Sequence, residues 1–378
     1  MAKRLIVCCD GTWNLADQPG KTNVTKVALS VLPRAAGVEQ RVYYHSGVGT
    51  RRGEHLRGGA FGMGLSSNVM DAYRFLVDTY EPGDMLYLFG FSRGAFTARS
   101  LAGLVRNCGI LRRENAGRIN EAWALYRDRI EKPTGTASVL FRRSYARETG
   151  IHFIGVWDTV GSLGIPDAGP QWLEPAVRRG NRRWAFHDTE LSSWVKGAFQ
   201  ALAIDEQRTP FEPTLWHQQP GAADNGQELK QVWFTGVHTD VGGGYKETAL
   251  SDITLLWMVD QARRYELEFD NEALSEAGPH EMAPDRSIEF RVRPDNMGTP
   301  HDSRTGLYRL ARPWHRPIGQ AADCQGRLDG CEYLSDTAKE HHDRVASYRP
   351  PELDRYLTQG RIHVEPVSLP ALTSRPDR

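Results

Sequence analysis

The sequence predicts an α/β protein built on a mostly parallel, doubly wound sheet. Short apolar runs recur at 4–9, 41–45, 85–89, 151–157 and 231–237. Glycine or a polar residue follows each run, and segments with helical periodicity separate several of them. Strands that alternate with helices are typical of parallel sheets, whose carboxyl ends gather functional side chains. We therefore expect the functional residues to lie just beyond these runs.

The strand predicted at 85–89 ends in a Gly-x-Ser-x-Gly pentapeptide formed around Gly90, Ser92 and Gly94. Residues 95–104 continue with helical periodicity, so the pentapeptide lies between a buried strand and a helix. The two glycines allow a tight turn that lifts the serine hydroxyl clear of the sheet. This pattern is a nucleophile elbow and predicts Ser92 as the nucleophile. The alternative is a glycine-rich turn with a solvated serine.

The elements before this turn occur in the order that an α/β-hydrolase requires. A strand at 4–9, a second strand at 41–45 and an amphipathic helix at 67–80 precede the strand at 85–89. Residues 82–84, Pro-Gly-Asp, end the helix and turn the chain into that strand. The fold class that we predict is therefore α/β-hydrolase-like.

The loop after the first strand carries candidates for an oxyanion hole. The N–H groups of Gly11 and Thr12, together with that of Arg93 after the nucleophile, are placed to stabilise a developing negative charge. Asp10 opens the same loop. It is a candidate either for contacting the substrate or for ordering the loop through hydrogen bonds.

Two later strands end in residues that complete the chemistry of a serine nucleophile. The run at 151–157 leads into Asp158, and the run at 231–237 leads into His238. Both residues fall where a doubly wound sheet gathers its catalytic groups. We expect His238 to act as the general base and Asp158 to orient its imidazole.

Other residues compete for these roles. His301, which has its own aspartate neighbour, is the main rival of His238 as the base. Asp205 is the rival carboxylate, although its apolar lead-in is also compatible with a helix. Asp240 precedes the three glycines at 242–244, which either let backbone approach a substrate or pack a helix against the sheet. Asp240 is thus a candidate for substrate contact or loop ordering.

Two further classes of function compete with a serine hydrolase. Asp10, Asp158 and Asp240 could converge on a divalent cation, since hard metals prefer carboxylate oxygens. No EF-hand, His-Glu-x-x-His or Cys/His metal motif supports that interpretation, so we expect no metal and no other cofactor. The second alternative is a non-catalytic binding module built on a hydrolase fold, against which the intact nucleophile and base argue.

Four motifs follow one another in a fixed order: Asp-Gly-Thr at 10–12, Gly-Phe-Ser-Arg-Gly-Ala at 90–95, Trp-Asp-Thr-Val at 157–160 and His-Thr-Asp-Val-Gly-Gly-Gly at 238–244. Together they resemble a family of α/β-hydrolases that includes the catalytic domains of bacterial type VI secreted phospholipases. The similarity extends from about residue 4 to about residue 355. The resemblance implies Ser92 as nucleophile, Asp158 as acid and His238 as base. It also implies ester hydrolysis, with acyl lipids as a substrate class.

The length of the chain suits one α/β domain over residues 1–378 with an inserted cap at 162–230. The predicted cap is rich in proline and contains tryptophans at 172, 184, 194 and 216. Aromatic side chains on a cap would contact an acyl or aromatic substrate. The alternative is a separate small core that uses the same tryptophans.

Composition limits the partners and the location of the chain. The formal net charge is zero, which argues against nucleic acid and anionic membranes as partners. No apolar run reaches the length of a membrane span, and the apolar run near the start is too short for a signal peptide. Five cysteines, two of them adjacent in a predicted core strand, suit a reducing compartment. We expect a cytoplasmic protein whose partner is a small-molecule or lipid ester.

Overall fold

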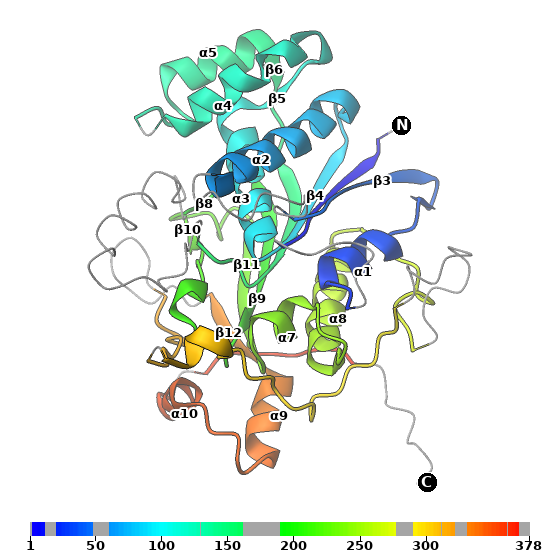
Figure 1. Cartoon of the computed structure of the whole chain (residues 1–378). Helices are drawn as coiled ribbons and strands as arrows, with labels where there is room; N and C mark the ends of the chain where they lie inside the picture. The colour runs from blue at the N-terminus through cyan, green and yellow to red at the C-terminus, as the bar shows by residue number, and fades with distance from the viewer. Residues whose placement is uncertain are drawn as a thin grey trace.

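A nine-stranded sheet forms the centre of the structure (Figure 1). The computed structural model describes residues 2–11, 20–47, 60–128, 130–161, 190–276, 290–310, 312–321, 331–360 and 362–369. In spatial order the strands of the sheet are β13 (Val364–Glu365), β12 (Glu332–Ser335), β11 (Glu228–Phe234), β9 (Val195–Ala203), β7 (Ile151–Trp157), β4 (Met85–Phe91), β1 (Arg4–Cys9), β3 (Val38–His45) and β2 (Arg34–Ala35). Within this sheet β2 is antiparallel to β3, and the other neighbours pair in parallel.

Helices cover both faces of the sheet. The helices α2 (Ala60–Thr79) and α3 (Arg93–Cys108) pack on one face, and α1 (Asn23–Ser30) and α8 (Ala249–Arg264) pack on the other. The remaining elements are β5 (Ile110–Leu111), η2 (Arg113–Arg118), α4 (Ile119–Arg127), α5 (Thr136–Tyr145), β6 (Ala146–Arg147), β8 (Glu190–Leu191), η4 (Thr209–Phe211), β10 (His217–Gln218), α7 (His238–Gly242), η6 (Gly306–Leu310), α9 (Asp336–Arg344) and α10 (Pro351–Thr358). The expected parallel sheet with helices on both faces is confirmed.

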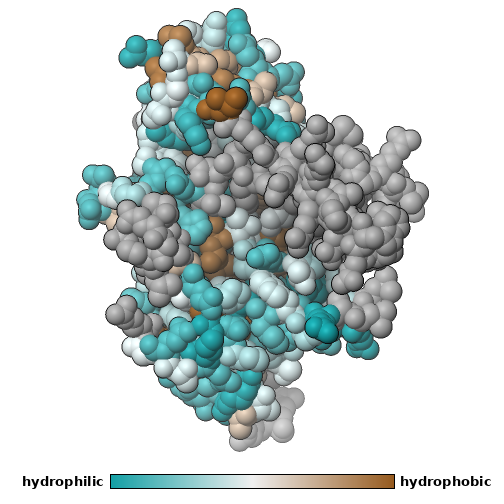
Figure 2. Space-filling view, turned by 90° about the vertical axis from the view of Figure 1, so that its left-hand side faces the viewer, coloured by the Kyte–Doolittle hydropathy of each residue, from teal (hydrophilic) through white to brown (hydrophobic). Residues whose placement is uncertain are grey.

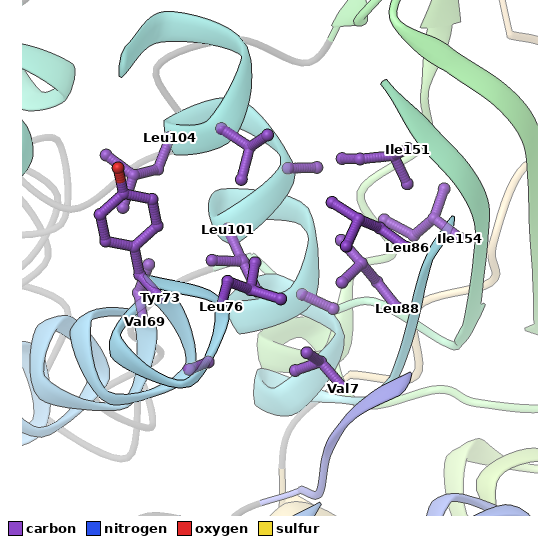
Figure 3. Packing of buried hydrophobic residues seen from close by; sticks show 14 of the residues in the cluster. Val7, Val69, Tyr73, Leu76, Leu86, Leu88, Leu101, Leu104, Ile151 and Ile154 are labelled. Carbon is purple, nitrogen blue, oxygen red and sulfur yellow. The ribbon is translucent and has the colours of Figure 1, made fainter. Parts of the chain in front are cut away.

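Strand periodicity explains the two cores. Successive side chains of a strand point to opposite faces. Val7 of β1 and Leu88 of β4 therefore join the core under α2 and α3, whereas the residue before each of them, Ile6 and Tyr87, joins the core under α1 and α8. Figure 3 shows Val7 and Leu88 packed toward Leu76 of α2 and Leu101 of α3. Full burial of each such leucine contributes roughly 1.5–3 kcal/mol. Both faces of the central strands are apolar because both are covered.

The chain reverses its direction of travel across the sheet between β1 and β4. After β1 it passes through α1 to β3 on one side, and after β4 it passes through α3 to β7 on the other. Loops that leave neighbouring strands toward opposite faces open a crevice at the carboxyl ends of those strands. The turn that carries Ser92 lies at this position.

Most of the expected elements have nearly the expected bounds. The strands β1 and β7 match them, and β3, β4 and α3 contain the expected segments. The helix α2 covers the segment expected at 67–80 except for its last residue. The strand expected at 231–237 is β11, which ends at Phe234, because residues 235–237 turn the chain into α7.

The bounds expected for the cap at 162–230 are corrected by the structure. Residues 195–203 form β9, a central strand between β7 and β11, so the apolar segment before Asp205 is a strand and not a helix. A strand buried on both faces is continuously apolar, and its periodicity does not distinguish it from a buried helix. Residues 162–189, with two of the four tryptophans, lie outside the described residues. Trp216 is buried in the core below Arg99, 4.3 Å from ring to guanidinium.

The face of the molecule in Figure 2 is mainly hydrophilic where it is coloured, with small separate hydrophobic areas. Among the described residues, the large hydrophobic side chains that are exposed include Ile130, between α4 and α5, and Leu140, within α5. None of the helices described is long and apolar enough to cross a membrane.

Gly94 is required by the close packing of α3 on β1. A Cβ atom at this position would lie 2.1 Å from the carbonyl oxygen of Cys9. Because backbone atoms cannot move aside cheaply, we expect Gly94→Ala to lower the free energy of unfolding by about 3 kcal/mol. Gly117→Ala is the matched control, since a Cβ atom there would meet nothing within 4 Å. Urea denaturation measures both, and equal stability of the two variants would contradict the expectation.

Candidate active site

The turn between β4 and α3 holds Ser92 in an unusual backbone conformation. Its φ is 58° and its ψ is −120°, and the residue is 8% exposed. A Cβ on Gly90 would lie 2.5 Å from the carbonyl oxygen of Gly94, so the turn needs glycine on both sides of the serine. Positive φ strains the backbone of a non-glycine residue, and residues strained in this way are frequent at functional sites. The expected tight turn between strand and helix is present.

Asp158 follows the neighbouring strand and is fully buried. Its φ is also positive, at 42°. The N–H of Ser92 donates to the carbonyl of Trp157 at 3.0 Å, so the serine and the aspartate lie at the ends of adjacent strands. The N–H of Asp158 donates in turn to the carbonyl of Ala201 on β9, which fixes the backbone of the aspartate.

His238 begins α7, and its side chain joins the other two residues. Its Nδ1 donates to Oδ2 of Asp158 over 2.5 Å. The imidazole ring packs against Phe91, the residue before the serine, with ring centroids 4.6 Å apart, and against Phe211 at 4.9 Å. The structure therefore brings His238, Asp158 and the turn of Ser92 to one edge of the sheet. Donation from Nδ1 leaves Nε2 as the nitrogen that can accept a proton.

The sequence did not indicate Arg316, which forms an ion pair with Asp158. Its Nη1 and Nη2 donate to Oδ1 and Oδ2 of the carboxylate at 2.6 and 2.9 Å, and the arginine is 1% exposed. Burial alone would raise the pKa of Asp158, but the charge of Arg316 and hydrogen bonds from His238 hold it well below its ordinary value. The carboxylate is thus ionised. No motif surrounds Arg316, so no pattern could have found it.

Glu206 is a second functional candidate that sequence reasoning missed. It is fully buried, and its Oε2 accepts from the N–H of His238 at 3.3 Å. Its Oε1 accepts from the hydroxyl of Ser303 at 2.8 Å, and Arg208 forms an ion pair with it. Burial opposes ionisation, but hydrogen bonding and charge from Arg208 lower the pKa of Glu206 to about 2. Recognition of β9 as a strand would have placed Glu206 near the catalytic edge.

Asp10 orders the loop after β1. Its Oδ2 accepts hydrogen bonds from Thr22 at 2.6 Å, Thr25 at 2.9 Å and Tyr44 at 2.9 Å, while its Oδ1 accepts from the N–H of Gly11 at 2.6 Å. Burial raises the pKa of Asp10, and these hydrogen bonds oppose the rise. Of the two roles considered for this aspartate, the contacts favour loop ordering.

The structure treats the three candidates for the oxyanion hole differently: one N–H is already engaged, one residue is not described, and one residue begins a helix. The N–H of Gly11 donates to Asp10, so this amide is already engaged. Thr12 lies outside the described residues. Arg93 is the first residue of α3, and burial lowers the pKa of its guanidinium to about 10. The N-terminus of a 16-residue helix favours negative charge at this position.

Asp240 and His301 form a separate pair beside α7. Nδ1 of His301 donates to Oδ1 of Asp240 at 2.6 Å, and Oδ2 accepts from the N–H groups of Val237 and His301, each at 3.0 Å. The ring of Tyr245 stacks on His301 with centroids 4.0 Å apart. The rival base is therefore paired with Asp240 and not with Asp158. Asp240 itself caps the start of α7.

The glycines at 242–244 pack backbone closely. A Cβ on Gly242 would lie 2.0 Å from the Phe91 ring, and one on Gly243 would lie 2.9 Å from the backbone nitrogen of Asn23. These contacts bring α7 against the turn of Ser92 and against the segment after β1. Of the two roles considered for the glycines, the contacts favour packing.

The three aspartates considered as cation ligands are each engaged by other donors. Asp10 accepts from hydroxyls, Asp158 from Arg316 and His238, and Asp240 from His301. Within the described ranges, no group of three or more His, Cys, Asp or Glu side chains is placed to hold a metal ion.

A parallel α/β sheet with a strained serine and a His–Asp pair at one edge is an arrangement found in hydrolases. Residues 3–261 match the family described as "T6SS, Phospholipase effector Tle1-like, catalytic domain", and the chain belongs to this family. The resemblance indicated by the four motifs is therefore confirmed.

Two uncharacterised proteins are similar to the chain. "Uncharacterized protein YEL023C" of Saccharomyces cerevisiae is 31% identical over 243 residues, which are 58% of this chain and 33% of the yeast protein. The chain thus spans about a third of the length of that relative. A crystal structure of an uncharacterized protein from Pseudomonas aeruginosa has a TM-score of 0.46 and 18% identity, over 77% of this chain and 49% of the other.

Asp205, the rival carboxylate, is engaged by groups other than His238. It accepts from the N–H of Gly236 at 2.6 Å and from the hydroxyl of Tyr348 at 2.9 Å. Burial raises the pKa of Asp205 to about 6, with a contribution from the charge of Asp240. A raised carboxyl pKa means that the folded state binds the proton more tightly than the unfolded state does.

This shift predicts a pH-dependent effect of Asp205→Asn. The stabilisation from protonated Asp205 is present below its ordinary pKa of 3.8 and is lost as the pH rises through about 6. The free energy of unfolding of the variant, relative to that of the wild type, should therefore be lower at about pH 4 than at about pH 7.5, by up to roughly 3 kcal/mol. Urea denaturation at both pH values measures the difference, with Asp224→Asn, an exposed carboxylate, as control. An effect independent of pH would refute the assignment.

Proposed function

We propose that the chain is a serine hydrolase of carboxylic esters that works through an acyl-enzyme. Ser92 is the nucleophile, His238 the general base and Asp158 the residue that orients the base. The observation that carries the proposal is the 2.5 Å hydrogen bond between His238 and Asp158, beside the strained turn of Ser92. The order of β1, β3, β4 and β7 in the sheet supports an α/β-hydrolase type of fold.

In the proposed reaction, Oγ of Ser92 attacks the ester carbonyl while Nε2 of His238 removes its proton. Asp158 holds the imidazole in the tautomer with Nδ1 protonated and stabilises the imidazolium. The imidazolium then protonates the leaving alcohol, and the acyl group stays on Ser92. Water activated by His238 hydrolyses this ester and regenerates the free serine.

For the oxyanion we propose the N–H of Arg93 and an N–H from the loop after β1. The engagement of Gly11 by Asp10 favours Thr12 of the two loop candidates. Backbone donors fixed before the reaction begins stabilise the developing charge without reorganisation. Acyl lipids are the substrate class that we propose, on the basis of the phospholipase description of the family.

The proposed mechanism needs no metal, and ester hydrolysis should survive exhaustive treatment with EDTA. Charge stabilisation by backbone amides replaces the role that a cation would have. The assay compares acyl esters of increasing chain length, with phosphate monoesters as controls, before and after chelation. A preference for longer chains would support a lipid substrate. Activity that is lost to EDTA and restored by calcium, magnesium or manganese would instead favour a metal-dependent hydrolase.

An activated serine should react covalently with a fluorophosphonate, and Ser92→Ala should abolish the reaction. Ser67→Ala, an exposed serine of α2, is the matched control. His238→Ala should slow labelling by orders of magnitude, because the base and nucleophile act as a unit. His301→Ala should slow it far less, since His301 is paired with Asp240. Mass spectrometry locates the adduct, and stoichiometric labelling of another residue would remove Ser92 as the nucleophile.

A further inference from the structure

A segment beyond the part of the chain that matches the family contributes to the candidate active site. The family match ends at residue 261, whereas the described residues 290–310 and 312–321 include side chains that contact the site. From this segment Ser303 donates to Glu206 and Arg316 donates to Asp158. The site residues within 3–261 are therefore completed by side chains from outside that range.

Four hydrogen bonds hold Arg316 in this position. Besides its two hydrogen bonds to Asp158, its Nη1 donates to the carbonyl of Ala203 at 2.9 Å and its Nη2 donates to that of Phe211 at 2.5 Å. These carbonyls lie at the end of β9 and in η4, so the guanidinium links both elements to Asp158. A planar guanidinium has the geometry to bind both carboxylate oxygens at once, and a lysine does not.

Asp158 thus shares its charge between two partners. Its Oδ2 accepts both from Nδ1 of His238 and from Nη2 of Arg316, while its Oδ1 accepts from Nη1 of Arg316 and from the N–H of Ala203. A carboxylate that is paired with a buried cation stabilises a neighbouring imidazolium less than an unpaired carboxylate would. The pairing also prevents the carboxylate from rotating away from the imidazole.

We propose that Arg316 is a positioning residue for the hydrolysis, fixing Asp158 against His238 and extending the activity of His238 as a base toward lower pH. The inference rests on the proposed Ser92–His238–Asp158 mechanism. Arg316 acts through Asp158 and does not touch the reacting atoms. Its role is to keep the imidazole oriented when the ester arrives.

The charged and titratable groups around His238 come from several elements. They are Asp158 after β7, Glu206 and Arg208 after β9, Asp240 in α7, and His301 and Arg316 from the C-terminal segment. Substitution of Arg316 leaves the other groups in place. A change in the pH profile of such a variant therefore reports the charge of Arg316.

The experiment compares Arg316→Gln and Arg316→Lys with the wild-type chain. The rate of fluorophosphonate labelling of Ser92 is measured across the pH range, together with kcat and KM for an ester that the wild type hydrolyses. Arg309→Gln is the control, because it removes the same charge from an exposed position of the same segment. Thermal unfolding is recorded for each variant.

For Arg316→Gln we expect kcat to fall at least about tenfold with little change in KM, because the base is less well oriented. The acidic limb of the labelling profile should move upward by about one pH unit, because loss of a nearby cation stabilises the imidazolium. Arg316→Lys keeps the charge and loses the two-point contact. It should keep the wild-type acidic limb while kcat is reduced.

Several outcomes would overturn the inference. A folded Arg316→Gln variant with the wild-type rate and pH profile would leave Arg316 with no role in positioning. If this variant does not fold, Arg316→Lys tests the positioning role in its place. An unchanged kcat for the lysine variant refutes the requirement for two-point contact. Failure of the wild type to label at Ser92 would refute the proposed function itself, whereas normal wild-type labelling with unaffected variants would refute only the role of Arg316.

Discussion

The arrangement of the site depends on one buried negative charge, that of Asp158. A carboxylate without solvent is costly unless opposite charges and hydrogen bonds surround it. The structure surrounds Asp158 with His238, Arg316 and the N–H of Ala203. These partners come from the end of β9, the start of α7 and the C-terminal segment. The requirement to compensate one charge therefore fixes how these parts of the chain meet.

The backbone of the candidate base is held by two more carboxylates. Asp240 accepts from the N–H of Val237, and Glu206 accepts from the N–H of His238, so both first donors of α7 are satisfied by side chains. Acidic groups at a helix N-terminus also interact favourably with the helix dipole. Each acid is in turn paired with a cationic or polar group, Arg208 and Ser303 for Glu206 and His301 for Asp240. The position of the imidazole is thus determined by a connected polar network.

Short stretches of the sequence predicted those strands and the turn whose conformation depends on neighbouring residues in the chain. Apolar runs followed by glycine or a polar residue located β1, β4 and β7, and the pentapeptide around Ser92 located the turn. The strand β9 was missed because burial on both faces removes the alternation that marks a strand. Arg316 could not be predicted, since its contact with Asp158 spans 158 positions and depends only on the tertiary fold.

The long separation in sequence between Asp158 and Arg316 also affects biosynthesis. Contacts between residues far apart in sequence form late in folding, because a long loop must close before they contribute stability. The acid of the site lacks its arginine partner until the ribosome has released the segment that carries Arg316. A nascent chain that already contains the serine, the histidine and the aspartate therefore lacks the completed charge network. Folding in this order keeps the candidate site incomplete until residue 316 has been made.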